Sequence, residues 1–403
     1  MASPHDNWCA AMTTLAASLA SLLGPAGNGP NPAGLALPVA APADEAELLE
    51  LLAFARSEQL RVIPMGSGTG LTRWRAGTGA DFALSTRRLT GVLAFEPDDG
   101  TLAARAGTPL HELAELAAGS GHHLSPRLRH APTASLGGVL SAGRAGPDRL
   151  RLGPPRHQLL GTRIALSDGT VAASGGRLVK NVAGFDLHRL HCGSRGTLGI
   201  ILEACLRLHP APEVSSRLAT RFAGPDQARA AAELVRRGPL RPWALVLEEL
   251  TGTDGSCTLH LELGGAEQVH AAELAWVRAA MAELNGATLA PASGEELDHW
   301  ADGAGARLTV TCQNSRLAAV APLLAELVPG PQVTQPDLSQ IHVFGHGPPL
   351  TEAERHPLAQ RLARQGARIT GHARAAEPGA EWSARIRGAL DPLSMFAETE
   401  AGS

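Results

Sequence analysis

Three short segments rich in glycine, serine and threonine recur in the first half of the chain, about 60 residues apart. They are residues 64–70, 134–143 and 193–199. Glycine lets a backbone approach a ligand closely and adopt positive φ angles, and successive N–H groups in such loops can bind an anion. Each segment alone is a weak signal, but their combination predicts three stretches of backbone gathered around one ligand.

The first segment follows a short expected strand, yet it is neither of the two common nucleotide-binding loops. It lacks the third glycine spacing of a dinucleotide fingerprint, and Leu71 excludes the Gly-Lys-Ser/Thr ending of a P-loop. A phosphate-binding loop and a plain structural turn remain open for it. The second segment, 134–143, is compatible with backbone lying flat against a planar ring and with close helix packing.

Composition narrows the class of protein. A chain of 403 residues with 44% apolar residues can bury a sizeable core, divided into two or three units. The balance of 35 basic against 39 acidic residues gives no overall basic footprint for nucleic acid. The five cysteines form no C-x-x-C pair, so local ligands for zinc or an iron–sulfur cluster are missing and no metal site is expected. This usage favours a reducing compartment, and we expect a cytoplasmic protein.

The pattern of helices and strands predicts four parts with an α+β fold. Residues 1–36 are expected to be an N-terminal helix, with Leu15, Leu19, Leu22 and Leu23 on one side, and a linker. In the second part, 37–212, Asp44 begins a helix that reaches about Glu58. A further helix follows Pro109. The expected strands of this part are 61–64, 82–85, 91–96, 101–106, 159–167 and 170–173. Asp98-Asp-Gly100 and Asp168-Gly169 predict hairpins between the strands on either side of them.

The third part, 213–375, has the element order of a ferredoxin-like unit followed by a weaker second copy. The first copy is expected at strand 218–222, helix 226–237, strands 244–250 and 257–263, and helix 266–284. The second is expected at 307–312, 315–327, 341–344 and 352–366. The fourth part, 376–403, is expected to return as a helix over 382–396 to the second part.

The motifs also resemble a known family. Leu166-Ser-Asp-Gly169, Gly175-Gly-Arg-x-Val-Lys-Asn-Val-Ala-Gly184 and Gly193-Ser-x-Gly-Thr-Leu-Gly199 look like those of the FAD-binding domain of the vanillyl-alcohol-oxidase (PCMH) type. The second motif holds Lys180, the only lysine of the chain. Within that family, the chain resembles most the FAD-binding E-type subunit of bacterial glycolate oxidase, over about residues 37–212.

The resemblance implies a flavin held between two α+β subdomains, with a ferredoxin-like cap covering its ring. Because no histidine stands in the matching positions, it implies noncovalent FAD. The residues implied to bind FAD are Pro64, Gly66, Ser67, Gly68, Thr69, Gly70, Thr133, Ser135, Gly137, Gly138, Gly193, Gly196, Thr197, Gly199 and Ile200.

The resemblance also implies an activity. The chain would be the FAD-binding subunit of a glycolate-oxidase-like complex that oxidises a 2-hydroxy acid to a 2-oxo acid. Its partners would be a catalytic FAD subunit and an iron–sulfur subunit, through which it would lie at the inner face of the cell membrane. Phe185, His157 and the tail after Leu393 depart from the family pattern. A self-sufficient FAD-dependent dehydrogenase or oxidase and a cofactor-free scaffold subunit stay open as alternatives.

No catalytic residue is assigned from the sequence. Five arginines cluster between residues 144 and 163, as a substrate carboxylate clamp or, preferably, as a solvated or partner-facing surface. His342 and His346 are better explained as an ordinary histidine pair than as metal ligands. Glu248 and Glu249 are neighbours on an expected strand and should point to opposite faces, which makes them poor candidates for a paired acid and base. The five arginines are Arg144, Arg149, Arg151, Arg156 and Arg163.

Overall fold

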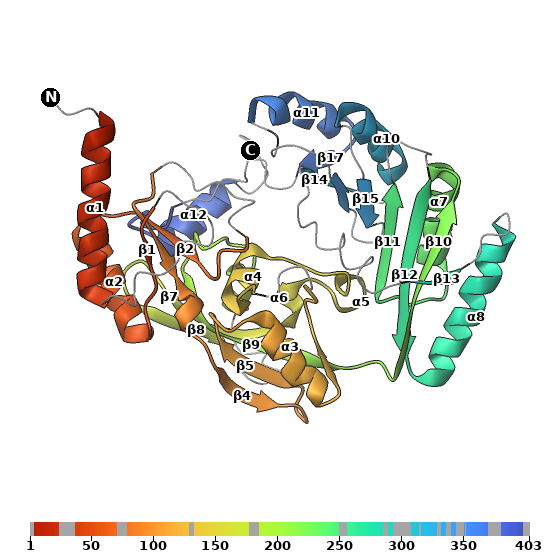
Figure 1. Cartoon of the computed structure of the whole chain (residues 1–403), viewed down its shortest axis with the longest axis horizontal. Coiled ribbons are helices and arrows are strands. Elements are labelled where there is room, and N and C mark those ends of the chain that lie inside the picture. The colour runs from red at the N-terminus through yellow and green to blue at the C-terminus, as the bar shows by residue number, and fades with distance from the viewer. Residues whose placement is uncertain are drawn as a thin grey trace.

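The computed structural model of the chain has an α+β fold with three sheets (Figure 1). None of the helices in its described part has the length and hydrophobicity needed to cross a membrane. The structure describes residues 4–23, 37–70, 79–128, 133–176, 185–249, 256–284, 289–292, 308–313, 316–328, 332–335, 340–343, 350, 352–369 and 380–397.

The first sheet is small and parallel, with the strand order β1-β3-β2. Helix α2 covers it because its leucines recur at helical spacing, and Asp44 caps this helix by accepting a hydrogen bond from the Glu47 N–H. Helix α1 packs on the same core through Leu19, whereas Leu22 is 40% exposed, so its expected place on the packed side is wrong. The elements are α1 (Pro4–Leu23), β1 (Val39–Ala40), α2 (Glu45–Ser57), β2 (Val62–Met65) and β3 (Phe82–Ser85).

The second sheet is antiparallel, with the order β4-β5-β9-β7-β8 and β6 paired to β9. The hairpins expected at Asp98–Gly100 and Asp168–Gly169 are confirmed, with both glycines at positive φ. The strands are β4 (Val92–Glu96), β5 (Thr101–Arg105), β6 (His122–Leu124), β7 (Leu159–Ala165), β8 (Val171–Gly175) and β9 (Ile200–Pro210). The helical segments between them are η3 (Thr86–Arg88), α3 (Leu110–Gly119), α4 (Leu136–Ala142), α5 (Arg149–Leu152), α6 (Pro155–Gln158) and η4 (Leu187–Leu190).

Strand β9 joins the two small sheets into one body. Side chains alternate across a strand, so Ile200 and Leu202 pack in the core of the first sheet while Ile201, between them, packs in the core of the second. This double burial explains why the strand is a nearly continuous apolar run in the sequence. It also fixes the two subdomains against each other at the N-terminal end of β9.

The third sheet, which we call the cap, has eight strands in the order β13-β10-β12-β11-β15-β16-β14-β17. The two expected ferredoxin-like copies therefore share one continuous sheet through the β11–β15 pair. The cap lies beside the two small sheets and is joined to them by the β9–β10 connection (Figure 1). Its strands are β10 (Val214–Phe222), β11 (Ala244–Glu249), β12 (Cys257–Gly265), β13 (Ala290–Pro291), β14 (Leu308–Cys312), β15 (Gln332–Gln335), β16 (Gln340–Val343) and β17 (Ala367–Ile369). Its helices are α7 (Pro225–Arg237), α8 (Glu267–Glu283), α10 (Leu317–Leu327) and α11 (Glu352–Arg364).

The end of the chain returns to the first sheet. Helix α12 (Ala380–Leu390) is shorter than the expected helix over 382–396, because buried Asp391 accepts the N–H groups of Met395 and Phe396 and turns the chain. The chain then pairs with β2, where the Val62 N–H donates to the Met395 carbonyl at 2.8 Å. The last described residues therefore extend the first sheet.

Candidate functional site

A cavity of about 770 Å3, partly open to solvent, lies where the two small sheets meet. All three small-residue segments contribute to its wall. The lining residues are Pro64, Met65, Gly66, Ser67, Gly68, Thr69, Gly70, Thr86, Ser135, Gly137, Gly138, Val139, Ser141, Ala142, Arg144, Arg195, Gly196, Gly199, Ile200 and Ile201.

The first segment leaves the end of β2 and turns back at Gly68, whose φ of +85° favours glycine. Its start is fixed to β3, since Ser85 Oγ donates to the Gly66 carbonyl at 2.8 Å. A Cβ on Gly66 would overlap Ser135 Oγ, so this glycine is needed for close packing against the second segment. The loop is therefore held in shape by protein contacts.

The second segment forms the start of helix α4. Ser135 caps the helix, with its Oγ accepting from the Gly138 N–H at 3.3 Å. Gly137 lies against the end of β5, where a Cβ would come within 2.7 Å of Ala106 Cβ. The sequence left open whether this run contacts a planar ring or allows close helix packing. Gly137 allows close packing, and the same short helix also lines the cavity.

The third segment binds to the other two. The Gly193 N–H donates to the Leu140 carbonyl at 2.9 Å, which fastens the segment to the C-terminal end of α4. Gly196, with φ of +80°, lies against β2, and a Cβ there would approach Pro64 Cβ to 3.1 Å. Segments that are about 60 residues apart in the sequence therefore touch one another around one hollow.

Most of the expected FAD-binding residues line this cavity, and three do not. Thr133 is exposed just before α4. Gly193 and Thr197 face a neighbouring hollow that is closed on its other side by Ser383, Ile386 and Arg387 of α12. The reason is the turn at residues 193–197, which carries only Arg195 and Gly196 to the cavity side.

The cavity also contains two cations that the sequence did not identify as ligands for the anionic part of a cofactor. Arg144 follows α4, and Arg195 is the variable position of the motif Gly193-Ser-x-Gly-Thr-Leu-Gly199. Burial lowers the pKa of Arg195 below its usual value, but an arginine remains charged in proteins. The cavity wall therefore includes two arginines beside the glycine loop.

The arginine cluster does not form one carboxylate clamp. Arg163 pairs with Glu45 and Glu203, at 2.9 and 2.6 Å, and so ties α2 to the second sheet. Arg151 lies over the ring of Trp243 in the cap, 5.0 Å from its centroid. Of the five arginines, only Arg144 lines the cavity.

The two glutamates of β11 have structural partners, as their neighbouring positions suggested. Glu248 contacts His260 of β12 at 3.2 Å, while Glu249 pairs with Arg229 of α7 at 2.6 Å. The described residues hold no group of three or more metal-ligating side chains. Lys180 and His346 lie outside the described residues.

Known proteins share sequence motifs and fold with this chain. Residues 36–175 match the family described as the FAD binding domain. The chain is 28% identical over 190 residues to glycolate oxidase subunit GlcD of Bacillus subtilis (strain 168), covering 47% of this chain and 40% of that protein. It is 35% identical over 172 residues to glycolate oxidase subunit GlcE of Escherichia coli (strain K12), covering 42% and 49%.

A third relative is D-lactate dehydrogenase of Archaeoglobus fulgidus, 33% identical over 172 residues, with 43% of this chain and 38% of that protein covered. The matched region therefore spans less than half of each of these relatives. A solved structure of alkyldihydroxyacetonephosphate synthase superposes on 89% of this chain and 76% of its own, with a TM-score of 0.67 and 15% identity. At that identity the likeness concerns the fold.

The cavity suits FAD on its own chemistry. A diphosphate needs N–H donors and cations, and the loop of residues 66–70 with Arg144 and Arg195 offers both. Apolar side chains and the small residues of α4 offer a surface for flat rings. Fold, cavity and family match agree on FAD as the cofactor, and residues 36–175 match the FAD binding domain.

Proposed function

We propose that the chain is the FAD-binding subunit of a glycolate-oxidase-like complex that oxidises a 2-hydroxy acid to a 2-oxo acid. The observation that carries this proposal is the single cavity built from all three small-residue segments. Relatives named glycolate oxidase subunits and D-lactate dehydrogenase share the same domain and act, by name, on 2-hydroxy acids. This shared chemistry supports the substrate class.

Within the cavity, the N–H groups of residues 66–70 and the cations Arg144 and Arg195 would hold the diphosphate of FAD. Bound FAD supplies a ring that accepts a hydride from the carbon that carries the substrate hydroxyl. We propose that the chain holds FAD noncovalently. The chain's part in the reaction is to orient the flavin and shield it from water.

Electrons must then leave the flavin for another carrier. Of the described cysteines, Cys205, Cys257 and Cys312 lie on the separate strands β9, β12 and β14, and Cys192 lies in the loop after η4. We therefore infer that the electrons pass to an iron–sulfur subunit, in a complex that also contains a catalytic FAD subunit. Such a complex would place this chain in the cytoplasm, at the inner face of the cell membrane through its partners.

The visible absorption spectrum of the purified chain tests the proposal, followed by anaerobic addition of glycolate or D-lactate with and without the partner subunits. We expect a yellow protein whose flavin bleaches only when the partners are present. Bleaching of the isolated chain would instead identify a self-sufficient dehydrogenase. A colourless chain that takes up no added FAD would refute flavin binding and leave a scaffold subunit.

A further inference from the structure

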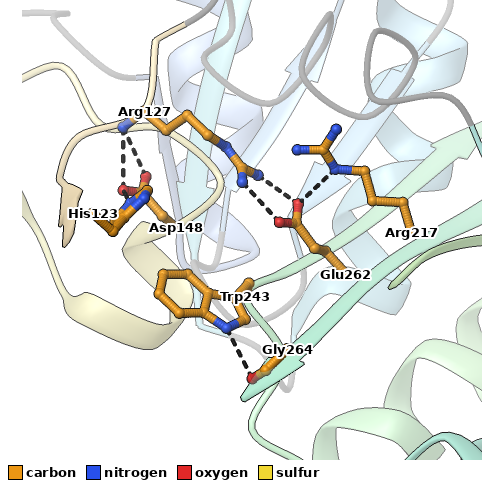
Figure 2. A network of polar contacts seen from close by, with 7 residues as sticks. All are labelled: His123, Arg127, Asp148, Arg217, Trp243, Glu262 and Gly264. Carbon is orange, nitrogen blue, oxygen red and sulfur yellow. Dashed lines mark hydrogen bonds and ion pairs between the residues drawn. The ribbon is translucent and has the colours of Figure 1, made fainter. Parts of the chain in front are cut away.

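A buried polar network connects the FAD-binding domain to the cap (Figure 2). The guanidinium of Arg127 donates two parallel hydrogen bonds to Glu262 of β12, at 2.8 and 2.6 Å. Arg217 of β10 contacts the same carboxylate at 3.3 Å. Bidentate arginine–carboxylate pairs are geometrically specific, so this pair sets the register between the domains. We call these residues, together with Asp148, His123 and Trp243, the cap network.

The same arginine also holds the FAD-binding domain together. Its backbone N–H donates to both carboxylate oxygens of Asp148, each at 3.1 Å, and His123 Nε2 contacts Asp148 at 3.0 Å. The Asp148 side chain is fully buried, and those of Arg127 and Glu262 are 13% and 7% exposed. Arg127 therefore ties a cap carboxylate to a buried carboxylate of the other domain.

The cap network is continuous with the wall of the FAD cavity. Asp148 follows Arg144, a cavity residue, by four positions, and the Arg144 N–H donates to Val139 of α4 at 3.1 Å. Between them, Gly146 is packed so tightly that a Cβ would overlap the Arg127 carbonyl and come within 2.8 Å of Asp148 Oδ1. Arg127 and Asp148 are thus in close contact with the segment that leads to Arg144 at the cavity wall.

Aromatic contacts hold the same interface. His123 lies edge-on to Trp243 of the cap, with ring centroids 5.1 Å apart. Trp243 is anchored by its own hydrogen bond to the Gly264 carbonyl at 3.0 Å. Leu150 of α5 packs against the hydrophobic core of the cap. The FAD-binding side of the network is therefore in contact with cap strands β11 and β12.

We propose that the cap network is a positioning device that sets the shape of the FAD cavity according to the position of the cap. Arg127 and Glu262 act as positioning residues, since Glu262 does not line the cavity and acts on it through Arg127, Asp148 and the segment 144–148. A cap held in place keeps the wall formed by α4 and Arg144 in its binding geometry. The proposal concerns cofactor affinity and does not depend on which substrate the chain oxidises.

Titration of the full-length apo chain with FAD, followed by flavin fluorescence, tests this coupling. We expect Glu262→Gln to weaken FAD affinity by about 5- to 150-fold, the usual range for coupling between separate sites. Arg127→Gln should have a similar effect. The FAD affinity of the double variant should lie within about twofold of that of the weaker-binding single variant, because both substitutions break the same contact. Wild-type affinity in a folded Glu262→Gln variant, or additive losses in the double variant, would overturn the proposal.

Controls separate coupling from general destabilisation. Glu233→Gln removes an ion pair with Arg236 on α7 of the same cap, and we expect unchanged FAD affinity. Glu262→Asp keeps the charge and should recover part of the affinity. Gly146→Ala disturbs the connecting segment without touching the cap, so it tests the same path if Glu262→Gln does not fold. Unchanged FAD affinity in Gly146→Ala would contradict coupling between Arg127 and the cavity wall through residues 144–148.

Discussion

Replacing Gly66 with alanine tests whether the contact between the first two segments shapes the FAD site. The new Cβ would overlap Ser135 Oγ and lie 3.2 Å from Ser135 Cβ. Ser135 must then rotate and give up its hydrogen bond from the Gly138 N–H. Losing a helix cap costs about 1 kcal/mol, and the remaining crowding costs about 1 kcal/mol more. We therefore expect Gly66→Ala to destabilise the apo protein by about 2 kcal/mol and to weaken FAD binding.

Urea unfolding combined with amide hydrogen exchange of α4 measures this change at the site itself. Ser135→Ala alone should cost about 1 kcal/mol, and the Gly66→Ala/Ser135→Ala double variant should fall about 1 kcal/mol short of the sum, because the cap is lost only once. Gly70→Ala is the matched control, since its Cβ meets no atom of the described residues within 4 Å. A fully additive double variant, or a Gly66→Ala chain as stable as wild type, would refute the reasoning.

Three further outcomes concern titration of buried groups. Burial would raise the pKa of Asp148, but the His123 hydrogen bond and the charges of His123 and Arg127 lower it overall. The ionised carboxylate therefore stabilises the fold above about pH 4, and this stabilisation is lost as the pH falls further. Asp148→Asn should lower the free energy of unfolding at pH 7 and make it depend less on pH in the acid range, as measured by urea titrations. Burial lowers the pKa of His191 to about 4, so the unfolded chain protonates this histidine at a higher pH than the folded chain does. The free energy of unfolding should therefore fall by about 3 kcal/mol between pH 6.5 and 4. His191→Asn should reduce this fall, and an unchanged pH dependence would contradict the reasoning. Burial raises the pKa of Cys192 to about 11, so iodoacetamide at pH 8 should alkylate it about 100-fold more slowly than an ordinary thiol, which peptide mass spectrometry can compare with the unfolded chain.

Local patterns were sufficient where a segment's conformation depends on its own residues. The strand expected over 82–85 is found at Phe82–Ser85, and the helix capped by Asp44 ends within one residue of its expected limit. Hairpins were recognisable from Asp-Gly pairs because these residues adopt the left-handed turn conformation at low cost. The resemblance to an FAD-binding family likewise depended on short motifs that can be read directly.

Elements with weak local signals were missed. Strand β1 has two residues and β6 three, too few for a periodic pattern. For the run 134–143 close helix packing was only one of two alternatives, since its glycines oppose helix formation and α4 is stabilised by the Ser135 cap and by packing on β5. The helix expected over 382–396 was too long because the buried Asp391 turn is invisible to periodicity.

The sequence by itself determined the hairpins, the small-residue segments and the helices with a clear apolar period, since these depend on contacts between near neighbours. Only the tertiary structure decided that Thr133 is exposed while Ser135 lines the cavity, and that Arg195 belongs to the site. It also decided that Arg127 meets Glu262, 135 residues further along the chain. Such pairings depend on how two folded domains pack against each other, and no local period in the sequence encodes that packing.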